Sequence, residues 1–112
     1  MSHKLKILLI DDEPTVRSGI RDFLASHGCE VEEADNRRAG HEAFRSRRPD
    51  AVVLDYLLPD GDTLELLSRF KETDANVPML ILTAQSSIEL AVRAVRQGAD
   101  QFLTKPVDLS AL

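Results

Sequence analysis

Several residue types are scarce or missing in this sequence. It has no tryptophan and a single cysteine, Cys29, which cannot form a disulfide within the chain, so a disulfide-stapled secreted scaffold is excluded. No apolar run approaches the roughly 18 residues that a membrane helix needs. The N-terminal stretch MSHKLKILLI reads into a strand pattern and has no signal-peptide core. We therefore expect a cytoplasmic protein with no membrane segment.

Positive charge is also in the minority. The chain has 14 Lys and Arg against 19 Asp and Glu, a formal net charge of −5. Because nucleic-acid binding needs clustered cations, we expect no direct contact between this chain and nucleic acid. The length of 112 residues predicts one domain, 1–112, and the hydrophobic fraction of 43% is that of an ordinary globular protein.

Short apolar runs alternate with segments of helical periodicity. Strands are expected at 5–10, 30–34, 51–54, 78–82 and 101–104. Helices are expected at 15–27, 37–47, 63–72 and 86–97, and a fifth helix that begins after Val107 is cut short. This alternation predicts an α/β fold with a parallel sheet covered on both faces. Five such strands commonly form the doubly wound, flavodoxin-like order 2-1-3-4-5.

Polar side chains follow four of these strands. Asp11 and Asp12 follow the first strand, Asp55 the third, Thr83 the fourth and Lys105 the fifth. The carboxyl ends of parallel strands share one edge of the sheet, so we expect these side chains to converge at the switch point in strand order. Carboxylates without nitrogen or sulfur ligands favour Mg²⁺, Ca²⁺ or Mn²⁺. A carboxylate, a hydroxyl, an ammonium and such a metal can together handle a phosphoryl group, and one Asp can attack phosphorus.

Four segments, in this order and spacing, carry a family resemblance. They are ILLIDDEP, VVLDYLLPDG, LILTA and GADQFLTKP. Together they resemble the receiver domain of two-component response regulators, in the CheY-like superfamily. The sequences of two segments, LPDGDTLELL and QFLTKPVDL, are most similar to those of receivers of the NtrC type. The resemblance implies a regulatory phosphoacceptor rather than an enzyme, a sensor histidine kinase as partner, and transcription as the output.

The resemblance also implies residue roles. Asp55 is the expected phosphoacceptor, and Thr83 and Lys105 are expected to contact phosphoryl oxygens. Asp12 is expected to bind Mg²⁺ directly and Asp11 mainly through metal-bound water. Asp55 and one backbone carbonyl complete the metal ligands.

That carbonyl belongs to Leu57, whose side chain offers no group to orient an attacking water. Position 85 is Gln. We therefore predict slow self-dephosphorylation.

A conformational switch is implied as well. In the family, a Thr at position 83 moves toward the phosphoryl group and an aromatic residue, here Phe102, rotates inward behind it. The Lys105–Pro106 bond is expected to be cis. The helix at 86–97, the strand at 101–104 and the helix that follows form the face that commonly mediates homodimers.

Two other functions stay open. A Mg²⁺-dependent phosphohydrolase on a similar sheet usually places its nucleophilic Asp two residues before a second Asp at the end of the first strand. Here Asp11 and Asp12 are adjacent and the candidate nucleophile is Asp55. A pseudo-receiver used only for docking is the other alternative. A P-loop NTPase is excluded because the chain has no GxxxxGK[ST] motif.

Several features have ordinary structural explanations. Any one of the acids alone could be a helix cap or a turn residue. Glu13 is interpreted as a solvated residue in the first turn of a helix. The stripe of Ile88, Ala91 and Val95 is interpreted as core. A cluster of arginines around 37–48 is interpreted as a solvated face, with a partner contact as the alternative.

Overall fold

The described residues, 4–84 and 87–105 of this computed structural model, form a five-stranded parallel sheet with helices on both faces. The strands are β1 (Lys6–Ile10), β2 (Glu30–Ala34), β3 (Ala51–Asp55), β6 (Met79–Thr83) and β7 (Gln101–Thr104). Their spatial order is β2-β1-β3-β6-β7. This confirms the predicted order 2-1-3-4-5 for these strands counted along the chain.

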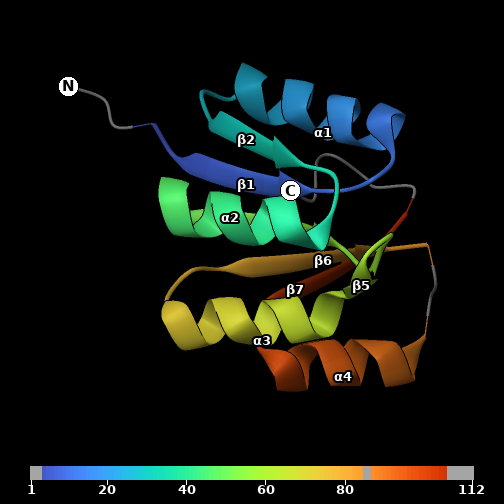
Figure 1. The fold of residues 1–112 in the computed structure, drawn as a ribbon. Coiled ribbons are helices and arrows are strands. Elements are labelled where there is room, and N and C mark those ends of the chain that lie inside the picture. Colours follow the sequence, from blue (N-terminus) through green and yellow to red (C-terminus); the bar gives the residue numbers. More distant parts are fainter. Residues whose placement is uncertain (1–3, 85–86, 106–112) are drawn as a thin grey trace.

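Within the described residues, four helices flank the sheet (Figure 1). They are α1 (Pro14–Ser26), α2 (Arg37–Arg47), α3 (Thr63–Thr73) and α4 (Ile88–Gln97). None of them has the length and apolar character needed to cross a membrane. The predicted fifth helix and Pro106 lie outside the described residues.

The core has two parts because successive strand residues point to opposite faces. On one face, Leu9 packs with Ile20 of α1. On the other face, Ile10 packs with Phe44 of α2 and Phe70 of α3, whose rings stack with centroids 4.1 Å apart. The central strands β3 and β6 are buried along almost their whole length, as their continuous apolar runs predict.

Local hydrogen bonds define where the helices begin. The side chains of Asn36, Asp62 and Ser87 each accept a hydrogen bond from an amide in the first turn of the helix that follows. Gly98 ends α4 at φ +114°, a conformation that glycine adopts without strain. These polar residues and the glycine are the signals that allow the helix bounds to be read from the sequence.

Two short strands were not predicted. Residues Leu57–Leu58 (β4) and Gly61–Asp62 (β5) pair antiparallel, where the sequence predicted only a loop at Pro59-Asp60-Gly61. Two-residue strands are too short for alternation to be visible in a sequence. The β4–β5 hairpin follows Asp55 directly, so it lies at the edge of the sheet where the polar residues converge.

The interpretation of the α4 stripe as core is wrong. Ile88 is 85% exposed and Val95 is 60% exposed, whereas Leu90 and Ala94 are buried. The physical reason is that α4 packs against α3 and β7 at one side of the sheet, so only a narrow strip of the helix meets the core. The periodicity showed that α4 has an apolar side but not how much of that side a neighbour covers.

Candidate functional site

The carboxylates at the ends of β1 and β3 converge as predicted. One oxygen from each of Asp11, Asp12, Glu13 and Asp55 can be chosen so that all four lie within 4.8 Å of one another. The convergence follows from strand pairing, because β1 and β3 are neighbours in the sheet. Four acids this close repel one another in the absence of a cation.

Asp11 is the most rigidly held of these acids. Its side chain is fully buried, its N–H donates to the Ala34 carbonyl at 3.0 Å, and its Oδ1 accepts the Glu13 N–H at 2.9 Å. Its carbonyl accepts a hydrogen bond from Arg17 Nη1 at 2.7 Å. Its other carboxylate oxygen, Oδ2, is buried and accepts no hydrogen bond from the described residues. Among these residues, an ion pair with Lys105 balances its charge.

Lys105 supplies the counter-charge. Its Nζ lies 3.2 Å from Asp11 Oδ2 and 3.3 Å from Asp55 Oδ2. The same nitrogen donates to Glu13 Oε1 at 2.7 Å. Burial disfavours the charged ammonium, but the Glu13, Asp55 and Asp11 carboxylates outweigh burial and raise the pKa of Lys105 above its usual value. Lys105 is therefore a fixed positive charge beside the acids.

Asp55 has an unusual titration. Its side chain is almost fully buried at the end of β3, and Oδ1 accepts a long hydrogen bond of 3.4 Å from the Leu57 N–H. Burial, followed by the negative charge of Asp11, raises the pKa of Asp55 to about 6, although Lys105 opposes the shift. Near neutral pH, Asp55 is then a carboxylate that is poorly solvated and available to react.

The remaining predicted residues lie around this centre. Thr83 is buried at the end of β6, and its carbonyl accepts the Lys105 N–H at 2.7 Å. Phe102 of β7 is partly buried and packs against the core on the α2–α3 side of the sheet. The Leu57 side chain is 59% exposed.

Glu13 is the residue that the sequence reasoning missed. It occupies the N-cap position of α1 rather than the first turn, and its carboxylate pairs with Lys105 while the side chain stays about half exposed. The predicted exposure of Glu13 is confirmed, whereas its ion pair with Lys105 was not predicted. The available signal was the run Asp11-Asp12-Glu13 directly after a buried strand, which places all three acids at one edge.

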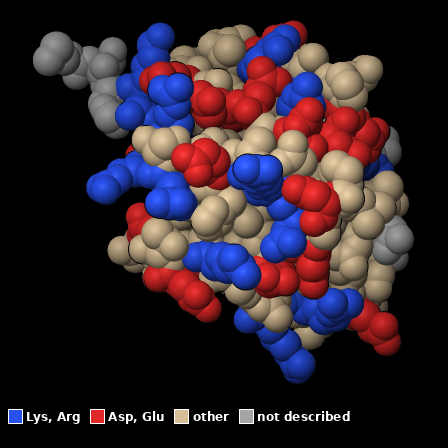
Figure 2. Space-filling view, in the orientation of Figure 1, with Lys and Arg blue, Asp and Glu red and all other residues tan. Residues whose placement is uncertain are grey.

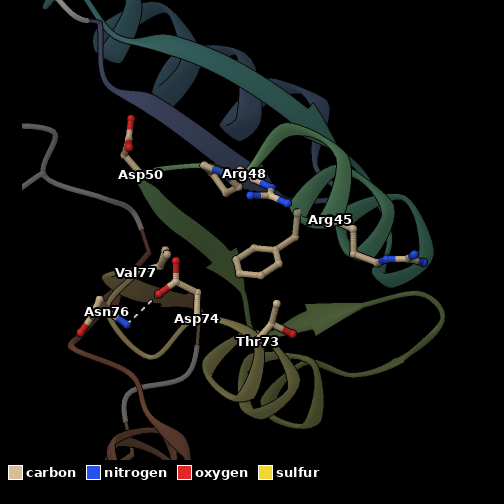
Figure 3. A pocket seen from close by; sticks show the side chains of 9 residues that line it. Arg45, Arg48, Asp50, Thr73, Asp74, Asn76 and Val77 are labelled. Carbon is tan, nitrogen blue, oxygen red and sulfur yellow. Dashed lines mark hydrogen bonds between the residues drawn. The ribbon is translucent and has the colours of Figure 1, made fainter.

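In the part of the chain that the structure describes, no second cluster of three or more potential metal-ligating side chains is found. A hollow of about 730 Å³ is lined by Arg45, Arg48, Asp74 and Asn76 among others (Figure 3). It lies beside the start of β3, at the sheet edge opposite Asp55, and its Asp74 carboxylate already accepts the Asn76 N–H at 3.1 Å.

The arginine-rich segment at 37–48 is not a continuous basic surface in the face shown. Figure 2 shows acidic and basic atoms interspersed there. Arg37 pairs with Glu65 at 3.6 Å and Arg47 with Glu32 at 3.8 Å. This supports the interpretation of a solvated face.

Comparison with known proteins identifies the family. Residues 7–112 match the response regulator receiver domain. The chain belongs to this family. This receiver domain is 39% identical over 108 residues to the transcriptional regulatory protein TrcR of Mycobacterium tuberculosis. The alignment covers 96% of this chain and 42% of TrcR. A receiver domain is a regulatory phosphoacceptor rather than a catalytic enzyme.

Solved structures agree with this assignment. The CheY-like receiver domain protein from Methanospirillum hungatei JF-1 is similar with a TM-score of 0.92 at 26% identity, over 97% of this chain and 87% of that one. A response regulator from Burkholderia pseudomallei, solved with a phosphorylated aspartic acid, a calcium ion and citrate, is similar with a TM-score of 0.90 at 26% identity, over 96% and 64%.

The receiver domain spans less than half the length of the curated relatives it matches, 42% of TrcR and 47% of the response regulator MprA from Mycolicibacterium vanbaalenii. The finer assignment to the NtrC type stays a prediction.

Proposed function

We propose that Asp55 accepts a phosphoryl group from a histidine kinase in the presence of Mg²⁺, and that this event switches an output, transcription. The observation that carries the proposal is the contact of Lys105 Nζ with Asp55 and Asp11 inside the acidic cluster. The relative from Burkholderia pseudomallei, with its phosphorylated aspartic acid and calcium ion, supports it by similarity. The domain 1–112 would then act as the receiver of a longer regulator.

The proposed step is the transfer of a phosphoryl group from a histidine of the kinase to the carboxylate of Asp55. A carboxylate oxygen of Asp55 attacks phosphorus, so an O–P bond forms while the N–P bond to the kinase imidazole breaks and its electron pair stays on that nitrogen. Lys105 pairs with a phosphoryl oxygen, and the Thr83 hydroxyl donates a hydrogen bond to another. These residues are already at the same sheet edge, so the transfer needs little rearrangement to bring them together.

The donor set fits a divalent metal. The carboxylates of Asp11, Asp12 and Asp55 and the backbone carbonyl of Leu57 would hold Mg²⁺, and all of them are oxygen ligands. Among the described residues, the buried Asp11 Oδ2 has the Lys105 ion pair and no hydrogen-bond donor, so it retains the capacity to face a cation. When bound, Mg²⁺ supplies positive charge that neutralises the acids and the incoming phosphoryl oxygens.

The output would depend on a change at the α4–β7 face. We propose that Thr83, Phe102 and Pro106 form the switch and that the α4–β7 face, with the helix after it, mediates a homodimer when Asp55 is phosphorylated. The exposed Ile88 and Val95 on α4 support this, because apolar side chains on one helix face favour burial against a partner.

Intact mass after incubation with Mg²⁺ and acetyl phosphate tests the proposal. The wild type is expected to gain one phosphoryl group, and Asp55→Asn none. Asp22→Asn, which changes an exposed Asp paired with Arg21, is the matched control and should react like wild type.

Two other outcomes would contradict the proposal. Repeated release of phosphate from many phosphoesters would indicate a phosphohydrolase. No adduct and no Mg²⁺ binding would indicate a docking pseudo-receiver. A phosphoryl half-life of seconds in the wild type would contradict the separate prediction of slow self-dephosphorylation.

A further inference from the structure

The β4–β5 hairpin is tied to a helix that is distant in the sequence. Asp60, in the turn of the hairpin, accepts the Arg37 N–H through Oδ1 at 2.7 Å and the Arg38 N–H through Oδ2 at 3.1 Å. These two amides open α2, and amides in the first turn of a helix have no partner inside the helix. The carboxylate therefore caps α2 from another part of the chain.

This contact adds to a local cap and does not replace it. The Asn36 side chain accepts the Ala39 N–H at 2.8 Å, which leaves the amides of Arg37 and Arg38 for Asp60. The negative charge of Asp60 also faces the positive end of the α2 dipole. Burial opposes ionisation of Asp60, but the hydrogen bonds from the Arg37 and Arg38 amides outweigh it and hold the pKa of Asp60 below its usual value.

A second contact holds the same hairpin. Gly61 has φ +138°, and a Cβ there would lie 2.7 Å from Arg37 Nη1, so the arginine side chain lies directly against the glycine. Arg37 Nη2 also pairs with Glu65 of α3 at 3.6 Å. The hairpin is thus attached to α2 by its turn residue and covered by the first side chain of that helix.

We propose that Asp60 is a positioning residue, which fixes the β4–β5 hairpin on α2 and thereby holds the Leu57 backbone where the metal site needs it. The inference rests on the proposed function, because it concerns Leu57 as a Mg²⁺ ligand. In the structure, Leu57 and Asp60 are connected through the short hairpin, in which Leu57 pairs with Asp62 and Leu58 with Gly61. A hairpin of two-residue strands is not stable by itself, so its order depends on external contacts, which are Leu58 in the core, Asp62 at the start of α3 and Asp60 on α2.

The consequence is an effect on affinity. The apparent affinity of a ligand that needs an ordered site is its intrinsic affinity multiplied by the fraction of molecules in which the site is ordered. Loss of the contact between Asp60 and α2 should weaken Mg²⁺ binding. It should leave the phosphorylation rate of the Mg²⁺-saturated protein nearly unchanged. Because coupling is mutual, Mg²⁺ should in turn protect the Arg37 and Arg38 amides from hydrogen exchange.

Asp60→Ala and Asn36→Ala form the matched pair. Each removes one cap from the start of α2, but only Asp60→Ala releases the hairpin. We expect Asp60→Ala to weaken Mg²⁺ affinity, measured by calorimetry, by about tenfold, the lower end of the range for groups that orient a metal ligand from outside the coordination shell. Asn36→Ala should bind Mg²⁺ like wild type, although both variants lower the urea midpoint. In metal-free protein, hydrogen exchange at Leu57 and Leu58 should rise in Asp60→Ala alone.

Phosphorylation by acetyl phosphate at saturating Mg²⁺ completes the test. Asp60→Ala should then react within about twofold of wild type, because bound metal has already ordered the site. Equal Mg²⁺ affinity in Asp60→Ala and wild type, or equal losses in both variants, would overturn the inference. If Asp60→Ala does not fold, Asp60→Asn, which keeps one acceptor oxygen, should show an intermediate loss, and wild-type affinity in it would overturn the inference. A wild type that neither binds Mg²⁺ nor gains a phosphoryl group would instead refute the proposed function.

Discussion

Lys105 Nζ lies 3.3 Å from Asp55 Oδ2 at the carboxyl edge of the sheet. The same ammonium lies 3.2 Å from Asp11, so one cation separates two buried carboxylates that come from neighbouring strands. Breaking such a group by removing one charge leaves the others without compensation. Lys105 therefore limits the rise in the Asp55 pKa that burial and Asp11 cause, and it contributes to the charge that an incoming metal or phosphoryl group meets.

Substitution of Lys105 should change the titration of Asp55. In Lys105→Met the pKa of Asp55 should rise above its value of about 6, because the charge and hydrogen bond of Lys105 contribute more to lowering it than the Leu57 amide does. Carbon NMR of the Asp55 carboxyl against pH measures this in metal-free protein. Lys71→Met is the control, since Lys71 pairs with Asp100 at 2.9 Å outside the acidic cluster. An unchanged Asp55 titration in Lys105→Met would show that the contact does not govern ionisation.

Asp55 should make the metal-free protein less stable as pH rises. Its pKa is about 6 in the folded protein against an ordinary 3.8, so between these values the folded state binds more protons than the unfolded state. The free energy of unfolding then falls as pH rises through this window, and the full loss is present above pH 6. Asp55→Asn should therefore gain about 1–2 kcal/mol at pH 8 after allowance for solvent screening, with the gain shrinking toward pH 4.

Urea denaturation in EDTA at both pH values measures this effect. Asp22→Asn, whose side chain is 71% exposed in the wild type, should stay within about 0.5 kcal/mol of wild type. A gain for Asp55→Asn that does not depend on pH would mean that packing rather than ionisation is responsible.

Magnesium should stabilise the folded protein. At ten times its Kd, the free energy of unfolding should rise by about 1.4 kcal/mol, because the ion binds the folded state only. The gain should largely disappear in Asp12→Asn, and it should be smaller at pH 5, where Asp55 is mostly protonated. Thermal melting with MgCl2 is compared with NaCl of equal ionic strength. Equal shifts with both salts would indicate screening of the acids without a metal site.

Two glycines inside helices should respond in opposite ways to alanine. At Gly40 a Cβ would lie 2.5 Å from Ile10 Cδ1 in the buried core, so Gly40→Ala should lower the free energy of unfolding by about 1 kcal/mol or more. At Gly19 no heavy atom lies within 4 Å of the added Cβ, so Gly19→Ala should raise it by about 0.5–1 kcal/mol. Urea denaturation compares the two. A higher free energy of unfolding in both variants would show that the Ile10 side chain moves aside at a small energetic cost.

Much of the architecture was visible in the sequence. The alternation of apolar runs and helical periodicity predicted the parallel sheet and its strand order, because burial on both faces and chain crossovers leave few other arrangements. The strand ends then predicted that Asp11, Asp12 and Asp55 converge, since parallel strands bring their carboxyl ends to one edge. The roles of these residues in metal binding and phosphoryl transfer stay predictions.

Other features required the tertiary structure. Two contacts join segments that are distant in the chain, that of Glu13 with Lys105 and that of Asp60 with the start of α2. The exposure of Ile88 also depends on which segments pack against α4. Periodicity indicates which side of a helix or strand is apolar. It does not indicate which neighbour packs against that side or which group the end of a long side chain contacts. The sequence alone determined the sheet and the edge at which its acids gather. Packing decided which cation balances those acids and which helix anchors the hairpin beside them, because both contacts depend on distances that arise only once the strands and helices are assembled.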